Sequence, residues 1–202
     1  MLYIIRYLLF ISILFYITNI FALESNLSLA NESTVRIISP LTHNNYESEI
    51  FVGLEYQLED GWKTYWKSPG DGGFPQKIDW TNSKNVESIE ILWPTPVKFE
   101  ILNIKSIGYE KNIIFPLKIN LKNNSSDTHL DFEINYLVCK DICIPGNAKV
   151  DLFIPSGKGN FTKYNYILEK TISELPISSI DLSFLDSVSS EIFVDNKNFL
   201  IQ

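Results

Sequence analysis

Two cysteines are the residues of this chain whose type and spacing best suit chemistry. Cys139 and Cys143 are its only cysteines, and three residues separate them in the stretch "LVCKDICIPG" (137–146). The stretch predicts a strand, a tight turn over residues 140–142 and a second strand. Residues that flank such a turn face each other with Cα atoms ~5.5 Å apart, a separation that disulfides also favour. A Cys139–Cys143 disulfide is therefore expected to be geometrically reachable.

The spacing leaves two interpretations of this disulfide open, a structural staple and a bond that exchanges electrons. A staple would stabilise little, because the loop is short and a loop of about 15 residues is needed for ~3 kcal/mol. Exposure at a turn makes a disulfide labile, which favours exchange. Local charge does not decide, since Lys140 favours a neighbouring thiolate while Asp141 disfavours it.

Other chemistry has weaker support in the sequence. Two cysteines with the distant His43 and His129 do not have the spacing of a four-ligand metal cage, and copper(I) on two thiolates is a minor alternative. We find no Ser/His/Asp arrangement, phosphate-binding loop or paired carboxylates strong enough to indicate hydrolysis. We therefore expect sulfur chemistry, with no metal and no cofactor.

The N-terminus indicates an exported protein. Residues 1–22 have one early charge, Arg6, then an apolar run and Ala22, which is the layout of a secretory signal peptide cleaved after Ala22. An uncleaved membrane anchor is the alternative, and the large Ile20 keeps lipid anchoring open. Without Arg6 the formal charge changes from −7 to −8. An acidic chain without basic clusters argues against nucleic acid as a partner.

The elements that position the cysteines are predicted to be strands. We expect a disordered lead-in at 23–33, a β-sandwich at 34–156 and a C-terminal extension at 157–202 with a short helix and one strand. Short alternating runs without a long helical period predict an all-β, immunoglobulin-like antiparallel sandwich. Pro116 is expected on an edge strand or at a bulge. The main predicted strands cover 50–58, 62–67, 77–80, 86–94, 113–121, 129–139 and 148–155.

The stretch "GWKTYWKSPGDGG" (61–73) combines aromatic and glycine residues. Trp62, Tyr65 and Trp66 could form a binding face, with the glycine loop approaching a partner closely. The alternative, which we favour, is that one face of this strand packs in the core and the glycines turn a corner.

Taken together, several ordered motifs resemble the N-terminal domain family of the thiol:disulfide interchange protein DsbD, and more closely its ScsB-type members. The resemblance covers roughly residues 35–155. It rests on the sequences "GWKTYWKSPGDGGFPQKIDW", "WPTPVKF", "SIGYEKNIIFPLKI" and "INYLVCKDICIPGNAKVDLFIP".

The resemblance implies a periplasmic, immunoglobulin-like domain that relays reducing equivalents. Its donor would be a thioredoxin-like periplasmic domain or a membrane electron-relay protein, and its acceptors would be client disulfide proteins. By analogy Cys143 would form the mixed disulfide and Cys139 would resolve it. If active, the chain would be a thiol–disulfide oxidoreductase of the protein-disulfide reductase type. The rival function is a non-catalytic periplasmic binding or assembly domain with a structural hairpin disulfide.

The resemblance also implies a cap loop over the sulfurs. By position this is "FEILN" (99–103), with Phe99 or Leu102 covering sulfur and Glu100 as the acidic group. The Cys-x3-Cys spacing departs from that of the best-known DsbD domain, so the cap geometry is expected to differ. Because the membrane and thioredoxin-like domains are absent, we expect a free-standing module, one half of a split system or a truncated remnant.

Overall fold

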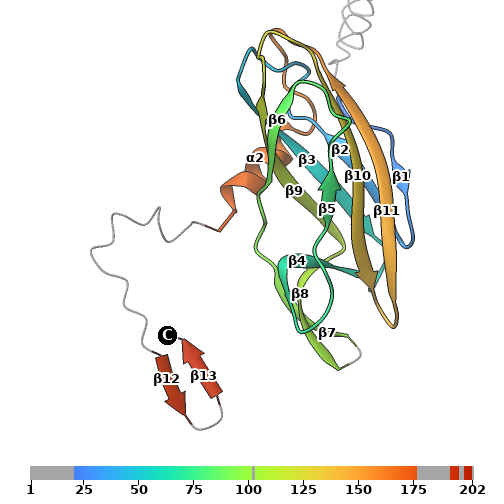
Figure 1. Cartoon of the computed structure of the whole chain (residues 1–202), viewed down its shortest axis with the longest axis vertical. Coiled ribbons are helices and arrows are strands. Elements are labelled where there is room, and N and C mark those ends of the chain that lie inside the picture. The colour runs from blue at the N-terminus through green and yellow to red at the C-terminus, as the bar shows by residue number, and fades with distance from the viewer. Residues whose placement is uncertain (1–20, 102, 177–191, 196–197, 202) are drawn as a thin grey trace, which may run out of the picture.

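Two antiparallel sheets packed face to face form the body of the protein (Figure 1). The computed structural model describes residues 21–101, 103–176, 192–195 and 198–201. The first sheet has the strand order β1-β2-β3-β9-β6 and the second the order β11-β10-β4-β8-β7, with β5 also paired to β10. The predicted all-β, immunoglobulin-like sandwich is confirmed.

Most strands coincide with runs of β-branched or aromatic residues in the sequence. The first sheet contains β1 (Ser28–Leu29), β2 (Ser33–Ile38), β3 (Glu49–Leu58), β9 (Asn112–Leu121) and β6 (Val86–Ile91). The second sheet contains β11 (Cys143–Ile154), β10 (Thr128–Cys139), β4 (Lys63–Gly70), β8 (Ile104–Glu110), β7 (Val97–Ile101) and β5 (Lys77–Asp79).

The core lies between the two sheets and follows the alternation of the strands. In β10 every second residue from Leu130 to Val138 is buried, because successive side chains of a strand point to opposite faces. Tyr56 of β3 packs edge-on against Phe115 of β9 and Tyr136 of β10, with ring centroids 5.4 and 5.1 Å away. These contacts join the two sheets.

The strand that carries the aromatic stretch has two different faces. Trp62, just before β4, and Trp66 pack against the core, as the favoured interpretation predicts. Residues 68–70 form the end of β4, although they include Pro69 and Gly70. A register shift between Tyr65 and Gly70 reaches the pair Gly70–Ser106, and such an irregularity lets a strand accommodate proline.

The position predicted for Pro116 is wrong. Pro116 lies in β9 inside the first sheet, opposite Gly53 of β3. Its carbonyl accepts a hydrogen bond from the N–H of Leu92, 2.8 Å away, beyond the last β6–β9 pair at Ile91 and Leu117. The missing N–H therefore faces the side on which β6 has ended, and the ladder with β3 loses no hydrogen bond.

The N-terminal lead-in expected to be disordered, residues 23–33, is part of the fold. Leu23 packs against the core, Glu24 forms a β-bridge with Ile38, and β1 pairs with β2. The polar composition predicted disorder wrongly, because these polar groups bond to residues that are distant in the sequence.

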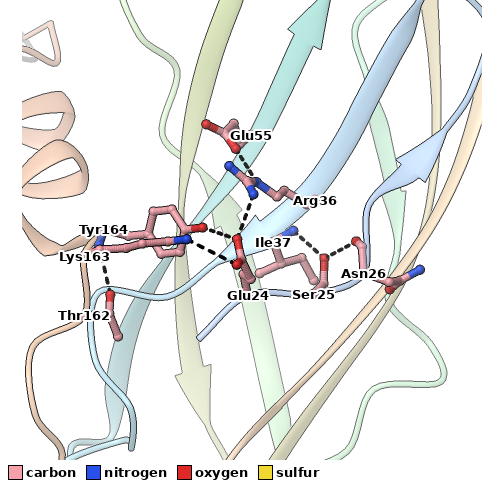
Figure 2. A network of polar contacts seen from close by, with 9 residues as sticks. All are labelled: Glu24, Ser25, Asn26, Arg36, Ile37, Glu55, Thr162, Lys163 and Tyr164. Atoms are coloured by element: carbon pink, nitrogen blue, oxygen red, sulfur yellow. Dashed lines mark hydrogen bonds and ion pairs between the residues drawn. The ribbon is translucent and has the colours of Figure 1, made fainter. Parts of the chain in front are cut away.

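Glu24 is the centre of a polar network that holds this segment (Figure 2). Its carboxylate accepts hydrogen bonds from the Tyr164 hydroxyl, from Arg36 at 2.7 Å and from Lys163 at 3.3 Å. The hydrogen bond from Tyr164 is the main cause that lowers the pKa of the Glu24 carboxyl. Arg36 also pairs with Glu55 of β3. The network joins residues before β1, two strands of the first sheet and the segment before the helix.

The C-terminal part contains the helix α2 (Asn165–Ser173), whose Leu168 is buried. Beyond it β12 (Ile192–Asp195) pairs with β13 (Asn198–Ile201), so two strands occur where one is expected. No helix in the described ranges is long and apolar enough to cross a bilayer. The predicted leader, residues 1–22, lies almost entirely outside the described residues.

Candidate functional site

The two cysteines face each other at the end of the β10–β11 hairpin. They are the last pair of the ladder and are joined by a disulfide, with Cα atoms 4.1 Å apart. The N–H of Lys140 bonds to the carbonyl of Ile142 at 3.0 Å, inside the turn. The cysteines therefore occupy a non-hydrogen-bonded pair, whose Cα atoms approach to ~4.5 Å, rather than the wider pair expected from the spacing.

The two sulfur-bearing residues differ sharply in exposure. Cys139 is 0 % exposed, because β10 is flanked there by β11 on one side and by Lys63 of β4 on the other. Cys143 is exposed, because β11 is the edge strand of its sheet. A reactant from solution therefore meets the sulfur of Cys143 first.

Tyr65 of β4 contacts the buried sulfur directly. Its hydroxyl donates a hydrogen bond to Cys139 Sγ at 2.9 Å and lies 3.9 Å from Cys143 Sγ. Tyr65 is 2 % exposed, and burial raises the pKa of its hydroxyl, so the group remains a proton donor at neutral pH. Tyr65 lies on the face of β4 opposite to Trp62 and Trp66, so the disulfide is on the outer face of its sheet, away from the main core.

The hairpin of β7 and β8 covers this outer face. Phe99 packs on Tyr65 with ring centroids 5.9 Å apart, and Ile101 is buried in the same small cluster with Cys139. The Lys63 ammonium lies over the Phe99 ring, 5.8 Å from its centroid. Residues 99–101 of the candidate cap are thus part of a paired strand, because residues 97–101 pair with 104–108.

The three candidate cap residues are placed differently. Phe99 is half-buried in the cluster around Tyr65. Glu100 is exposed and pairs in register with Lys105, on the strand face opposite to Phe99. Leu102 lies outside the described residues.

The glycine-rich loop forms another side of the Tyr65 site. Gly73 has a φ of 94°, and a Cβ there would lie 2.2 Å from the Tyr65 ring. On the neighbouring strand, a Cβ on Gly108 would lie 2.0 Å from the carbonyl oxygen of Thr64. Gly73 therefore lets the loop pack on the Tyr65 ring, and Gly108 lets the backbone of β8 approach that of β4.

Charged side chains near the turn bond to the backbone rather than to sulfur. The ammonium of Lys140 donates to the Asp60 carbonyl at 3.1 Å, and that of Lys63 donates to the Gly61 carbonyl at 3.1 Å. Lys63 also pairs with Glu110 at 3.4 Å. Within the described ranges, the only hydrogen bonds to the two sulfurs come from the Tyr65 hydroxyl.

The histidines are remote from the sulfurs. His129 is at the other end of β10, about 30 Å away at ~3.3 Å per residue, and lies 3.6 Å from Asp151. His43 bonds to its neighbour Thr42. No group of three or more His, Cys, Asp or Glu side chains that could hold a metal ion occurs in the part of the chain that the structure describes.

Comparison with known proteins matches this arrangement to a family. The family described as "Thiol:disulfide interchange protein DsbD, N-terminal" matches residues 40–155, which is more than half of the chain and includes both cysteines. The chain belongs to the DsbD N-terminal domain family. A search of curated proteins finds no match.

Among solved structures, the DsbD-like fold recurs in the N-terminal periplasmic domain of ScsB from Proteus mirabilis. The match has a TM-score of 0.60 and 24 % identity, and it covers 79 % of this chain and 62 % of that one. At this identity it supports the fold alone. The DsbD family assignment confirms the resemblance stated from the sequence motifs.

The sequence motifs did not reveal Tyr65 as a residue that contacts sulfur. A signal was present, because Tyr65 is out of phase with the core-facing Trp62 and Trp66 on the same strand. A large aromatic residue on the second face of a strand, next to a glycine-rich loop, indicates a second packed site.

Proposed function

We propose that the protein is a periplasmic thiol–disulfide exchange module that relays reducing equivalents through Cys139 and Cys143 to client proteins. The observation that carries the proposal is the asymmetry of the pair. An exposed Cys143 is joined to a buried Cys139 whose sulfur accepts the Tyr65 hydrogen bond. Membership of the DsbD N-terminal family supports the same conclusion.

Reduction would begin at the exposed sulfur. A donor thiolate attacks Cys143 Sγ, the 139–143 bond breaks, and Cys139 leaves as a thiolate. The Tyr65 hydroxyl stabilises this leaving group, because a hydrogen bond to an ionised acceptor is stronger than one to a neutral acceptor. The second thiolate of the donor then attacks the donor sulfur that is bonded to Cys143, and Cys143 leaves as a thiolate. The donor becomes a disulfide, and two electrons have moved to the module.

Delivery to a client would use the same sulfurs in reverse order. The Cys143 thiolate attacks a client disulfide, forming a mixed disulfide and releasing one client thiolate. Cys139 then attacks Cys143 Sγ, which restores the 139–143 disulfide and releases the second client thiolate. Two electrons pass to the client, and the thiolates take up protons from water. Sulfur carries every electron, so the cycle requires no cofactor.

The surroundings of the pair would limit which proteins can react. Tyr65 and the β7–β8 hairpin with Phe99 close the site around Cys139, which leaves approach through Cys143. We assign Phe99 or Leu102 to shielding, and Glu100 to the exposed rim of the cap. Only Cys143 would then be open to attack, and Cys139 would stay shielded until a partner has reacted with Cys143.

The partners follow from the proposed chemistry. The donor would be a thioredoxin-like periplasmic domain or a membrane electron-relay protein, and the acceptors would be client proteins with exchangeable disulfides. Export by the leader at residues 1–22, with cleavage or with retention as an anchor, would place the domain in the periplasm. Because the chain spans 62 % of the ScsB domain that it matches, these partners are part of the proposal.

A redox titration tests the proposed function. The purified protein is equilibrated in glutathione buffers, and the fraction of the 139–143 disulfide is measured by thiol alkylation and mass spectrometry. We expect a midpoint well above about −300 mV, the value below which structural disulfides typically lie. A midpoint below that value would instead support a binding or assembly domain with a structural staple.

Trapping tests the direction of attack. In Cys139→Ser, the remaining Cys143 should accumulate a mixed disulfide with a thioredoxin-like donor or with clients in a periplasmic extract. Cys143→Ser is the matched control and should accumulate far less, because the remaining sulfur is buried. Equal trapping by the two variants would contradict the assigned order.

A further inference from the structure

The outer edge of β11 presents free backbone groups beside the exposed sulfur. β11 is the terminal strand of its sheet. The hydrogen bond from Lys140 N–H to the Ile142 carbonyl places the cysteines in a non-hydrogen-bonded pair. In such a pair the N–H and C=O of each residue point away from the partner strand. The N–H and C=O of Cys143 therefore point outward, away from β10.

Farther along β11, the N-terminal segment covers the same edge. The Asn31 side chain donates to the Pro145 carbonyl at 2.8 Å, and the N–H of Lys149 donates to Ser28 Oγ at 3.2 Å. Pro145 itself has no N–H to expose. Proteins commonly protect sheet edges with such side chains and prolines. Here the cover ends at Pro145, two residues from the reactive sulfur.

Nothing in the described part of the chain bonds to the outward N–H or C=O of Cys143. These two groups form one donor and one acceptor in line with a sheet, which is the pattern that an added extended strand completes. A partner helix could not complete it, because a helix N-terminus offers free N–H groups without a free carbonyl, and a helix C-terminus offers the reverse.

We propose that clients dock on this edge by strand addition. An extended client segment that carries one cysteine of the client disulfide pairs antiparallel to β11, with that cysteine directly opposite Cys143. The inference rests on the proposed exchange function and names the surface through which exchange occurs.

The register of the added strand also suits the bond that must form. Cys143 and the opposing cysteine form a hydrogen-bonded pair and exchange both backbone hydrogen bonds. Such a pair sets the Cα atoms ~5.5 Å apart, which lies within the range that disulfides favour. The backbone contacts therefore position the two sulfurs for the mixed disulfide without selecting other side chains. Strand addition thus explains how one site can serve several clients.

Hydrogen exchange in a defined adduct tests the proposal. The adduct joins Cys143 of Cys139→Ser to an acetylated and amidated pentapeptide with a central cysteine between β-branched residues. The peptide is supplied as its mixed disulfide with thionitrobenzoate; the Cys143 thiolate attacks the peptide sulfur and thionitrobenzoate leaves. This route forms the adduct whether or not a natural donor exists, so the test is separable from the proposed function.

We expect the amide hydrogen of Cys143 to exchange at least about tenfold more slowly in the adduct than in free Cys139→Ser. The amide of Ile144, which faces Val138 in the ladder, is the internal control and should not change. Unchanged exchange at Cys143 would overturn strand addition, while the titration and trapping results would stand.

The peptide backbone provides a second test. Methylation of the amide nitrogen of the peptide cysteine removes the donor that faces the Cys143 carbonyl. We expect the activated methylated peptide to react about tenfold more slowly than the unmethylated one, as for the loss of one hydrogen bond of ~1.4 kcal/mol. The two peptides should react equally with free cysteine. Equal rates with the protein would overturn the proposal.

A matched variant extends the free edge. Asn31→Gly uncovers the Pro145 carbonyl, and glycine tolerates the φ of 31° at this position. In the Cys139→Ser background, we expect the activated unmethylated peptide to react about threefold faster with Asn31→Gly than with the protein that retains Asn31. Mixed disulfides of small thiols with thionitrobenzoate should react with both proteins at the same rate. An equal acceleration for small thiols would show that Asn31 acts on sulfur exposure, against the proposal.

Discussion

The hydroxyl of Tyr65 lies 2.9 Å from Cys139 Sγ, although the two residues are 74 positions apart in the sequence. The contact places a neutral donor on the buried sulfur, and the exposed sulfur of Cys143 is 3.9 Å from the same hydroxyl. One tyrosine can therefore stabilise the sulfur that becomes ionised when the disulfide opens.

Tyr65→Phe should lower the reduction potential of the 139–143 pair. Loss of the hydroxyl removes stabilisation from the reduced state, and a hydrogen bond to a charged group contributes ~1.5–3 kcal/mol. Since ~1.4 kcal/mol corresponds to ~30 mV for a two-electron couple, we expect a midpoint about 30 mV more negative. Glutathione titration measures it. Tyr166→Phe, at a residue 74 % exposed on α2, is the matched control and should leave the midpoint unchanged. An unaltered midpoint in Tyr65→Phe would remove Tyr65 from the proposed cycle.

Alkylation of the reduced protein should distinguish the two thiols. Cys143 is exposed and Cys139 is fully buried, so iodoacetamide should modify Cys143 at least about tenfold faster. Peptide mass spectrometry at timed intervals measures both rates. In 6 M guanidinium chloride the difference should disappear, because burial causes it. Faster labelling of Cys139 in the folded protein would contradict the assigned order of attack.

Gly73→Ala should disturb both stability and redox behaviour. The new methyl group meets the Tyr65 ring, and a φ of 94° is strained for alanine, so we expect a loss of about 1–3 kcal/mol in unfolding free energy. Gly157→Ala is the control, because its φ of 130° is also unfavourable but the nearest atom to a Cβ is 3.4 Å away. Only Gly73→Ala should also shift the midpoint potential. If both variants shift it, the effect does not pass through Tyr65.

Tyr56→Phe should not destabilise the protein at neutral pH. The Tyr56 hydroxyl is buried and lacks a hydrogen-bond partner in the described part of the chain, so its removal leaves no group unsatisfied. Tyr136→Phe is the matched comparison and should cost about 1 kcal/mol, because the Tyr136 hydroxyl bonds with Ser33 at 2.7 Å. Urea unfolding measures both. A loss of stability in Tyr56→Phe as large as in Tyr136→Phe would contradict the assignment.

The same tyrosine predicts a dependence on alkaline pH. Burial raises the pKa of Tyr56 well above its ordinary value, so above about pH 10 the tyrosine ionises more readily in the unfolded chain, and the unfolding free energy falls as pH rises. Tyr56→Phe lacks this loss. Its unfolding free energy relative to that of the wild type should therefore increase by up to ~1.4 kcal/mol per pH unit above pH 10.

Glu24→Gln should destabilise the protein by about 1 kcal/mol at pH 7. The pKa of Glu24 is lowered, chiefly by the Tyr164 hydrogen bond, so its contribution is present above the unfolded pKa near 4.5 and is lost as pH falls through the folded pKa. The difference between variant and wild type should therefore vanish near pH 2. Glu87→Gln, at an exposed position of β6, is the control. A difference that persists at pH 2 would show that the charge of Glu24 is not the cause.

Local patterns in the sequence were sufficient to predict the sandwich and the cysteine hairpin. Alternation of apolar residues fixes which face of β10 is buried, and the three-residue turn fixes which residues face each other. The family resemblance also pointed to Phe99, which lies in the cluster around Tyr65.

Features that depend on distant partners were not predictable in this way. The interior position of Pro116 depends on where β6 ends, and the order of the N-terminal segment depends on Glu24 meeting Arg36 and Lys163. The contact of Tyr65 with sulfur depends on β4 lying beside β10. No local pattern contains these pairings.

The disulfide lies outside the main core, on the far side of a sheet whose inner face holds the sandwich together. The proposed opening and closing of the bond would therefore leave the hydrophobic interior undisturbed. Natural variation or protein engineering can then tune thermal robustness and electron affinity separately, the first through the interior and the second through the few residues around Tyr65.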